Sequence, residues 1–64
     1  MLGRGVEVRL NNNDSFFRGT LKSLDGHMNV LLTNATELSG ERPVSKWREV
    51  VLRGNNVLYV RKVQ

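Results

Sequence analysis

Apolar and charged residues alternate at the start of the chain and predict a β-strand. In residues 6–10 (VEVRL), valine and leucine alternate with glutamate and arginine, which is the period of a half-buried strand. Residues 11–14 (NNND) are all turn formers. We therefore expect a hairpin loop that leads into a second strand.

The second predicted strand covers residues 15–24 and has two different faces. Phe17, Gly19 and Leu21 share one face, because alternate residues of a strand point the same way. The opposite face has a mixed, mostly polar set: Phe16, Arg18, Thr20 and Lys22. A glycine inside a strand usually marks a bend, a bulge or a close approach of backbone. We therefore expect strong curvature at Gly19.

The third predicted strand follows a short turn at residues 25–27. It covers residues 28–37 and places Met28, Val30 and Leu32 on one face. Leu31 breaks the alternation between apolar and polar positions. This predicts a strand covered on both sides, as a central strand would be.

Two more strands complete the predicted fold. Residues 38–43 contain the only proline and indicate a loop, residues 44–52 form the fourth strand, and residues 57–63 form the fifth after a turn at 53–56. No segment is a convincing helix. Five short strands at roughly ten-residue spacing favour an all-β fold, either a small barrel or a strongly bent sheet.

The order of the strands predicts which turns meet. If successive strands run antiparallel, alternate connections lie at the same end of the sheet. The turn at residues 25–27 and the turn at residues 53–56 then share one end, and residues 11–14 and 38–43 share the other. The two most distinctive turns of the chain are therefore expected to be neighbours.

Length and composition restrict how this fold can be stabilised. The 64 residues contain no cysteine and one histidine, so disulfides are excluded and a structural zinc site is not expected. We predict one domain over residues 1–64, and a domain this small buries only about 60% of its unfolded surface. Small scaffolds without disulfides or metals often rely on oligomerisation, which we expect here.

The charge of the chain favours a polyanionic partner. Ten Lys/Arg against six Asp/Glu give a net charge of +4 and a pI of about 10.4, which suits nucleic acid or an anionic membrane surface. There is no basic amphipathic helix, no apolar run of about 20 residues and no signal peptide pattern. We therefore expect an intracellular protein with no membrane partner.

Several residues in the two neighbouring turns are candidates for chemistry. His27 is the only histidine, and a lone histidine in a turn is commonly solvent-exposed and inert. Asp25 and Asn29 could simply form a self-bonded turn. Arg53 could be a surface charge, and Gly54 could supply a positive φ. These alternatives stay open on the residue types alone.

Two motifs resemble those of the Sm/LSm family. The first, at about residues 6–38, contains FRGTL at 17–21 and DGHMN at 25–29. The second, at about residues 50–63, contains VLRGNNVLYV at 51–60. The resemblance implies the Sm fold, a five-stranded, strongly bent antiparallel sheet of the SH3-like small-barrel type. Family members usually begin with a short helix, but only five residues precede Val6, so we expect that helix to be missing or vestigial.

The resemblance also implies a function. Sm-like subunits assemble into rings, usually heptamers, through their fourth and fifth strands, here residues 44–52 and 57–63. Neither range contains a proline that would block an edge. The partners would be copies of this chain or other Sm/LSm subunits, together with U-rich single-stranded RNA.

The resemblance assigns a role to each residue of one uracil pocket per subunit, with no cofactor or metal. His27 would stack on the base, Asn29 would hydrogen-bond its edge, and Arg53 would cover the opposite face. Asp25 would brace the turn and orient Asn29, and Gly54 would allow the backbone to approach.

The residues do not decide between family members. The two motifs are most similar to F-type Sm and sixth-type LSm chains or to archaeal Sm-like proteins, whereas residues 46–48 (KWR) are more like the fourth LSm type. A eukaryotic member would act in snRNP assembly, splicing or mRNA decay, in the nucleus or cytoplasm. An archaeal one would form a homomeric RNA-binding ring in the cytoplasm.

Two other functions compete with RNA binding. An SH3-like adaptor would need an aromatic-lined groove for proline-rich peptide, and the chain has four aromatic residues in all. Catalysis is not expected, because His27 has no cysteine partner and the carboxylates are scattered along the chain.

Overall fold

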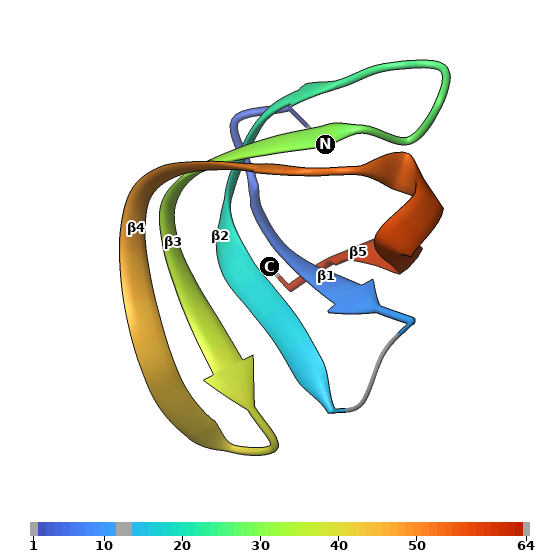
Figure 1. The fold of residues 1–64 in the computed structure, drawn as a ribbon. Helices are drawn as coiled ribbons and strands as arrows, with labels where there is room; N and C mark the ends of the chain where they lie inside the picture. Colours follow the sequence, from blue (N-terminus) through green and yellow to red (C-terminus); the bar gives the residue numbers. More distant parts are fainter. Residues whose placement is uncertain (1, 12–13, 64) are drawn as a thin grey trace.

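The computed structural model describes residues 2–11 and 14–63, which form a single antiparallel sheet (Figure 1). Its strands are β1 (Gly5–Leu10), β2 (Ser15–Leu24), β3 (Val30–Ser39), β4 (Arg42–Leu52) and β5 (Val57–Lys62), and a 3₁₀ turn, η1 (Gly54–Asn56), joins the last two. The order in the sheet is β4-β3-β2-β1-β5. The predicted all-β, five-stranded architecture is confirmed, with β4 and β5 as the two edges. Residues 12 and 13 of the expected hairpin loop lie outside the described residues.

Little helical structure accompanies the sheet. Residues 2–4 form a turn and a bend before β1. Within residues 2–11 and 14–63, no helix is long and apolar enough to cross a membrane.

The sheet bends sharply in the middle of the neighbouring strands β2 and β3. The pairing of these strands shifts register between Arg18 and Thr20, on either side of Gly19. A Cβ atom built on Gly19 would lie 3.0 Å from the Cα atom of Ala35, and Asn34 has a φ of 51°. The curvature predicted at Gly19 is therefore confirmed, and it involves both strands: β2 has no side chain at this point, and β3 turns through a left-handed residue.

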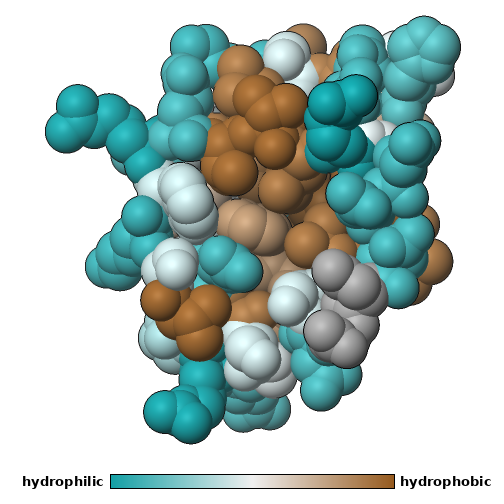
Figure 2. Space-filling model, in the orientation of Figure 1, coloured by the Kyte–Doolittle hydropathy of each residue, from teal (hydrophilic) through white to brown (hydrophobic). Residues whose placement is uncertain are grey.

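The core lies inside this bend. Its buried side chains come from four strands and are Val6, Val8, Phe17, Leu21, Val30, Leu32, Ala35 and Leu52. Phe17 and Leu21 share the core face, as the period of β2 predicts. Figure 2 shows apolar side chains gathered at the centre of one face of the molecule, with hydrophilic residues around them.

The start of the third strand was predicted wrongly. Met28 was predicted to share one face with Val30 and Leu32 in a strand beginning at residue 28, but β3 begins at Val30. Met28 has a φ of 63° and is 41% exposed. Its left-handed backbone belongs to the turn, because the hydrogen bonds of Asp25 close that turn as far as Asn29.

The predicted loop at residues 38–43 was too long. β3 runs to Ser39 and β4 starts at Arg42, so two residues make the turn, with Gly40 at a φ of 63°. Pro43 therefore lies inside β4, contrary to the expectation that the edge strands contain no proline. An edge strand accommodates it because one side of the strand has no neighbour to which an N–H must be donated.

The two ends of the sheet are arranged as strand order predicts. At one end the turn between β2 and β3 lies beside η1, where the Gly54 amide donates to the Asn29 side chain over 2.7 Å. At the opposite end the Gly40 amide donates to the Asp14 carbonyl over 3.2 Å. The chain thus brings two turns 25 residues apart into one small site.

Candidate nucleic-acid interface

Asp25 organises the turn between β2 and β3. Its Oδ1 atom accepts hydrogen bonds from the backbone amides of His27 (2.8 Å) and Asn29 (2.9 Å). Its Oδ2 atom accepts from Nδ2 of Asn29 at 3.0 Å. One carboxylate therefore fixes both the backbone of the turn and the amide group of Asn29.

Gly54 connects this turn to η1. Its amide donates to Oδ1 of Asn29, and a Cβ atom at this position would collide with the backbone carbonyl oxygen of His27. Gly54 is not among the glycines with positive φ. It is required here because the two turns approach closely, and the alternative that it supplies a positive φ is excluded.

The Asn29 amide is held in one orientation. Its oxygen must face the Gly54 N–H and its nitrogen must face the Asp25 carboxylate, because the reverse would oppose donor to donor and acceptor to acceptor. A primary amide has two N–H donors and an oxygen with two lone pairs. One donor and one lone pair remain for a ligand after these two bonds.

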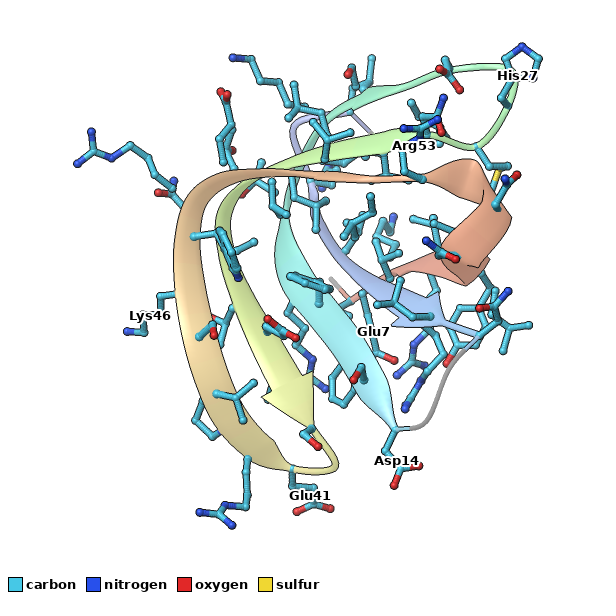
Figure 3. All side chains as sticks on the ribbon, in the orientation of Figure 1. Glu7, Asp14, His27, Glu41, Lys46 and Arg53 are labelled. Atoms are coloured by element: carbon cyan, nitrogen blue, oxygen red, sulfur yellow. The ribbon has the colours of Figure 1, made fainter. Side chains whose placement is uncertain are left out.

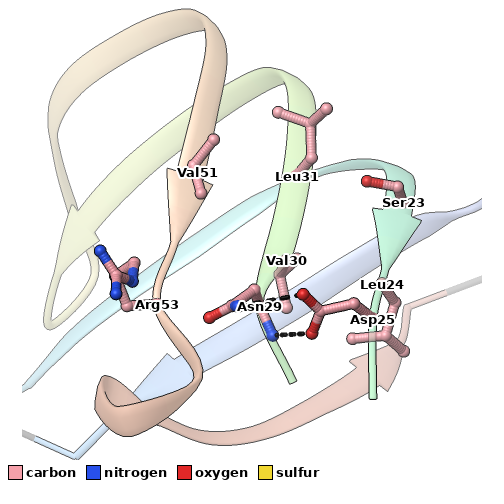
Figure 4. A pocket seen from close by; sticks show the side chains of 8 residues that line it. All are labelled: Ser23, Leu24, Asp25, Asn29, Val30, Leu31, Val51 and Arg53. Carbon is pink, nitrogen blue, oxygen red and sulfur yellow. Dashed lines mark hydrogen bonds between the residues drawn. The ribbon is translucent and has the colours of Figure 1, made fainter. Parts of the chain in front are cut away.

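A pocket opens beside Asn29 (Figure 4). Its polar wall comes from Ser23, Asp25, Asn29 and Arg53, and the apolar wall comes from Leu24, Val30, Leu31 and Val51. Three of the five residues predicted for the site, Asp25, Asn29 and Arg53, thus line a common cavity. Gly54 is not part of the lining, but its amide donates a hydrogen bond to Asn29, which is.

His27 is placed differently from the other predicted residues. Its imidazole projects from the tip of the turn, away from the sheet, whereas Arg53 lies at the end of β4 nearer the sheet (Figure 3). In this single chain the contacts of His27 with the site are made by its backbone. The His27 ring is therefore accessible, and the structure does not bring it against Arg53.

The apolar wall was missed at the level of sequence. Leu31 and Val51 are cross-strand neighbours and point away from the core. The signal was present in the broken alternation at Leu31, which predicted a strand covered on both sides. In the single chain this second face is not covered, because Leu31 is only half-buried and lines the open pocket together with the exposed Val51.

The charge state of Asp25 follows from its hydrogen bonds. The bonds from the backbone and side chain of Asn29, followed by that from the His27 amide, hold the pKa of Asp25 below its ordinary value. Asp25 is therefore a carboxylate at neutral pH and stays an acceptor for all three donors.

The remaining described residues offer no competing metal centre. No three His, Cys, Asp or Glu side chains within residues 2–11 and 14–63 lie close enough together to hold an ion.

The fold and the site together define a class. A strongly bent five-stranded sheet with two open edges, and a polar pocket made by two turns at one end, describes a small β-domain of the Sm-like type. The chain belongs to the LSM domain family, whose model matches residues 1–62. The predicted family is confirmed.

Relatives and solved structures agree with this assignment. The chain is 40% identical over 60 residues to the U6 snRNA-associated Sm-like protein LSm6 of Lodderomyces elongisporus, covering 94% of this chain and 74% of that protein. It is 57% identical over 44 residues to a putative snRNP Sm-like protein of Methanosarcina acetivorans, covering 69% and 61%.

Two solved structures show the same fold. The Sm protein of Pyrococcus abyssi in complex with a uridine heptamer superposes with a TM-score of 0.93 at 34% identity, covering 97% of this chain and 86% of that one. A heptameric archaeal Sm protein gives 0.88 at 36% identity, covering 98% and 90%.

Proposed function

We propose that this chain is one subunit of a ring that binds U-rich single-stranded RNA, with one uracil held by each subunit. The observation that carries the proposal is the fixed amide of Asn29, which Asp25 and Gly54 hold from two different turns. Recognition of single-stranded RNA depends on stacking and on hydrogen bonds to exposed base edges, and this site offers groups for both.

The spare donor and acceptor of Asn29 match uracil. The N3–H group of uracil donates to Oδ1, and a neighbouring carbonyl of the base accepts from Nδ2. Cytosine in the same pose would place an acceptor against Oδ1 and an amino group against Nδ2. Because the amide cannot flip without losing its bonds to Asp25 and Gly54, the site favours uracil over cytosine.

Two side chains would enclose the base. We assign the Arg53 guanidinium to one face and the His27 imidazole to the other, since both planar groups stack on bases. Stacking contributes about 1–3 kcal/mol per base. The His27 ring is exposed at the tip of the turn and is therefore open to stacking by a base.

Ring assembly follows from the two edges. β4 and β5 are each paired on one side only, and open edges are prone to pair with another chain. Large apolar side chains are exposed on these edges, namely Val44, Trp47 and Val51 on β4 and Leu58 and Tyr59 on β5. Pairing β4 of one subunit with β5 of the next closes a ring with no free edge, and the heptameric archaeal Sm protein supports a count of seven.

A ring explains how a weak pocket becomes useful. Each pocket contacts one base, and linked pockets on one oligonucleotide bind with much higher avidity than any single pocket. We propose that the ring contains copies of this chain or other Sm/LSm subunits, and that it acts in intracellular RNA metabolism by binding, without catalysis of its own. The LSm6 and archaeal Sm-like relatives support both kinds of ring.

Fluorescence anisotropy with oligo(U), oligo(C) and oligo(A) of equal length tests the proposal, with native mass spectrometry to count subunits. We expect a preference for oligo(U) that the double variant His27→Ala/Arg53→Ala abolishes while the ring remains. Arg42→Ala is the matched control, because Arg42 is exposed at the other end of β4. Equal binding of the three oligonucleotides, or a U preference that survives the double variant, would overturn the pocket assignment.

A further inference from the structure

Three arginines surround one buried carboxylate on the face of β1 that is opposite the core. Glu7 lies between the core residues Val6 and Val8, so its side chain leaves the strand on the other side. It is only 2% exposed. The groups around it come from β1, β2 and β5, and we call Glu7, Arg9, Arg18, Tyr59 and Arg61 the Glu7 cluster.

The carboxylate of Glu7 is fully occupied. Nε and Nη2 of Arg18 both lie 3.3 Å from Oε1, and Nη2 of Arg61 lies 3.4 Å from the same atom. Oε2 accepts a hydrogen bond from the Tyr59 hydroxyl at 3.5 Å and forms ion pairs with Nε of Arg61 at 3.4 Å and Nη2 of Arg9 at 3.8 Å.

Strand register and one aromatic ring hold the arginines in place. Glu7 is paired with Arg18 on β2 and with Arg61 on β5, its two neighbouring strands. The guanidinium carbons of Arg9 and Arg18 lie 4.4 Å and 5.6 Å from the centre of the Phe16 ring, within the range of a cation–π contact. The guanidinium groups are therefore pre-positioned, which lowers the entropy lost when they bind a ligand.

The cluster has an unneutralised positive charge. Three guanidiniums against one carboxylate leave two positive charges in excess, which is half of the net charge of +4 of the whole chain. In the single chain the side chains of Arg18 and Arg61 are 54% and 59% exposed. Each guanidinium has five N–H donors, and Glu7 engages only some of them.

Exposed, pre-positioned guanidiniums with excess charge are suited to phosphate. We propose that the Glu7 cluster is a second RNA contact, which binds the phosphate backbone of single-stranded RNA without regard to sequence. The choice of RNA as the polyanion rests on the proposed function. The cluster shares no residue with the two-turn site, and Figure 3 shows Glu7 on β1, away from His27 and Arg53.

Oligo(A) is the probe that separates the two contacts, because it lacks the base that the two-turn site selects. We expect the double variant Arg18→Gln/Arg61→Gln to weaken oligo(A) binding several-fold. The slope of log K against log[salt] should shrink by about 0.7 for each phosphate that the variant no longer neutralises. The U-over-C preference should not change, since Asn29 is untouched. Unchanged oligo(A) affinity and an unchanged salt slope would overturn the proposal.

Two further double variants serve as controls, one for loss of structure at the cluster and one for a general effect of charge. Arg18→Lys/Arg61→Lys keeps both charges and should retain most of the binding. Arg4→Gln/Arg42→Gln removes the same charge from exposed sites outside the cluster and should change the slope less. If this control weakens oligo(A) as much as the cluster variant does, the cluster is not a site. Native mass spectrometry and thermal melting confirm that each ring is intact.

The outcome is distinct from a failure of the proposed function. If His27→Ala/Arg53→Ala abolishes the U preference but leaves salt-dependent oligo(A) binding, both contacts exist. If no U preference is found and Arg18→Gln/Arg61→Gln still lowers oligo(A) binding, only the two-turn assignment is wrong.

Discussion

The two-turn site and the Glu7 cluster use hydrogen bonds in opposite ways. In the two-turn site, short side chains and backbone amides make contacts of 2.7–3.0 Å, in the optimal range for such bonds. In the Glu7 cluster, long side chains from three strands converge at 3.3–3.8 Å. The first arrangement fixes the direction of a donor and an acceptor, and the second accumulates charge.

This difference shows how selectivity and charge are divided in a chain of 64 residues. A fixed amide can reject a wrong base, because a donor or acceptor left unpaired in a site is costly. The guanidiniums of the Glu7 cluster would meet phosphates, which are the same at every nucleotide, and so cannot discriminate sequence. The chain places the selective amide in the turns held together by Asp25 and Gly54, and the charged guanidiniums on strands.

The largest expected effect is that of Gly54→Ala. The new Cβ would collide with the His27 carbonyl. Neither the Cβ atom nor the backbone carbonyl can rotate out of the way, so the two turns must separate. We expect a loss of about 3 kcal/mol in the free energy of unfolding, at the upper end for overpacking, together with loss of U preference. Urea denaturation and oligo(U) anisotropy measure the two effects.

Gly26→Ala is the matched control for Gly54→Ala. Gly26 lies in the same turn as His27, and a Cβ there would meet nothing within 4 Å. Its stability and binding should stay close to wild type. If Gly54→Ala and Gly26→Ala behave alike, the site does not depend on the close approach of the turns. Oligo(A) binding by the Glu7 cluster should persist in both variants.

An intermediate effect is expected from Glu7→Gln, which removes the charge that the arginines surround. Burial raises the pKa of Glu7, but hydrogen bonds and charges from Arg61 and Arg18 outweigh it and leave the pKa below the ordinary value of 4.5. We expect the substitution to cost about 1–2 kcal/mol of stability at neutral pH. Thermal melting measures this loss.

The pH dependence gives a second readout for Glu7. A carboxyl with a depressed pKa in the folded state stabilises the fold above its unfolded pKa, and this stability is lost as pH falls through the folded pKa. Wild type should therefore lose stability below about pH 4.5 more steeply than Glu7→Gln. Parallel acid profiles for the two proteins would show that the carboxylate does not stabilise the fold. Oligo(A) binding by the variant should be tighter at pH 7, because the cluster loses its one negative charge.

The smallest effect on stability, but a specific one on recognition, is expected from Asp25→Asn. The new amide would oppose one of its N–H groups to Nδ2 of Asn29, and the orientation of the Asn29 amide would no longer be fixed. The ratio of oligo(U) to oligo(C) affinity should fall roughly fivefold to tenfold, while oligo(A) binding stays unchanged. An unaltered U-to-C ratio would mean that Asp25 does not orient Asn29 for the base.

The sequence by itself determined the strand number, the faces of β2 and the neighbourhood of the two turns. These follow from local rules: the two-residue period of a strand, the turn preference of Asp and Gly, and the alternation of ends in an antiparallel sheet. Even the bend was predictable at Gly19, since a glycine in mid-strand has few other roles. The candidate roles of Asp25, Asn29 and Gly54 came from the resemblance to the Sm/LSm family, because the residue types alone left a self-bonded turn equally possible.

Only the tertiary structure decided how far each turn extends and which strands are neighbours in the sheet. Met28 adopts a left-handed backbone because Asp25 bonds beyond it, and Pro43 is tolerated because β4 lies at an edge. The apolar wall of the pocket and the Glu7 cluster depend on which strands are neighbours. Glu7 meets Arg61 over 54 residues of sequence solely because β5 pairs with β1. Such pairing is set by the packing of the whole core, which no local pattern contains.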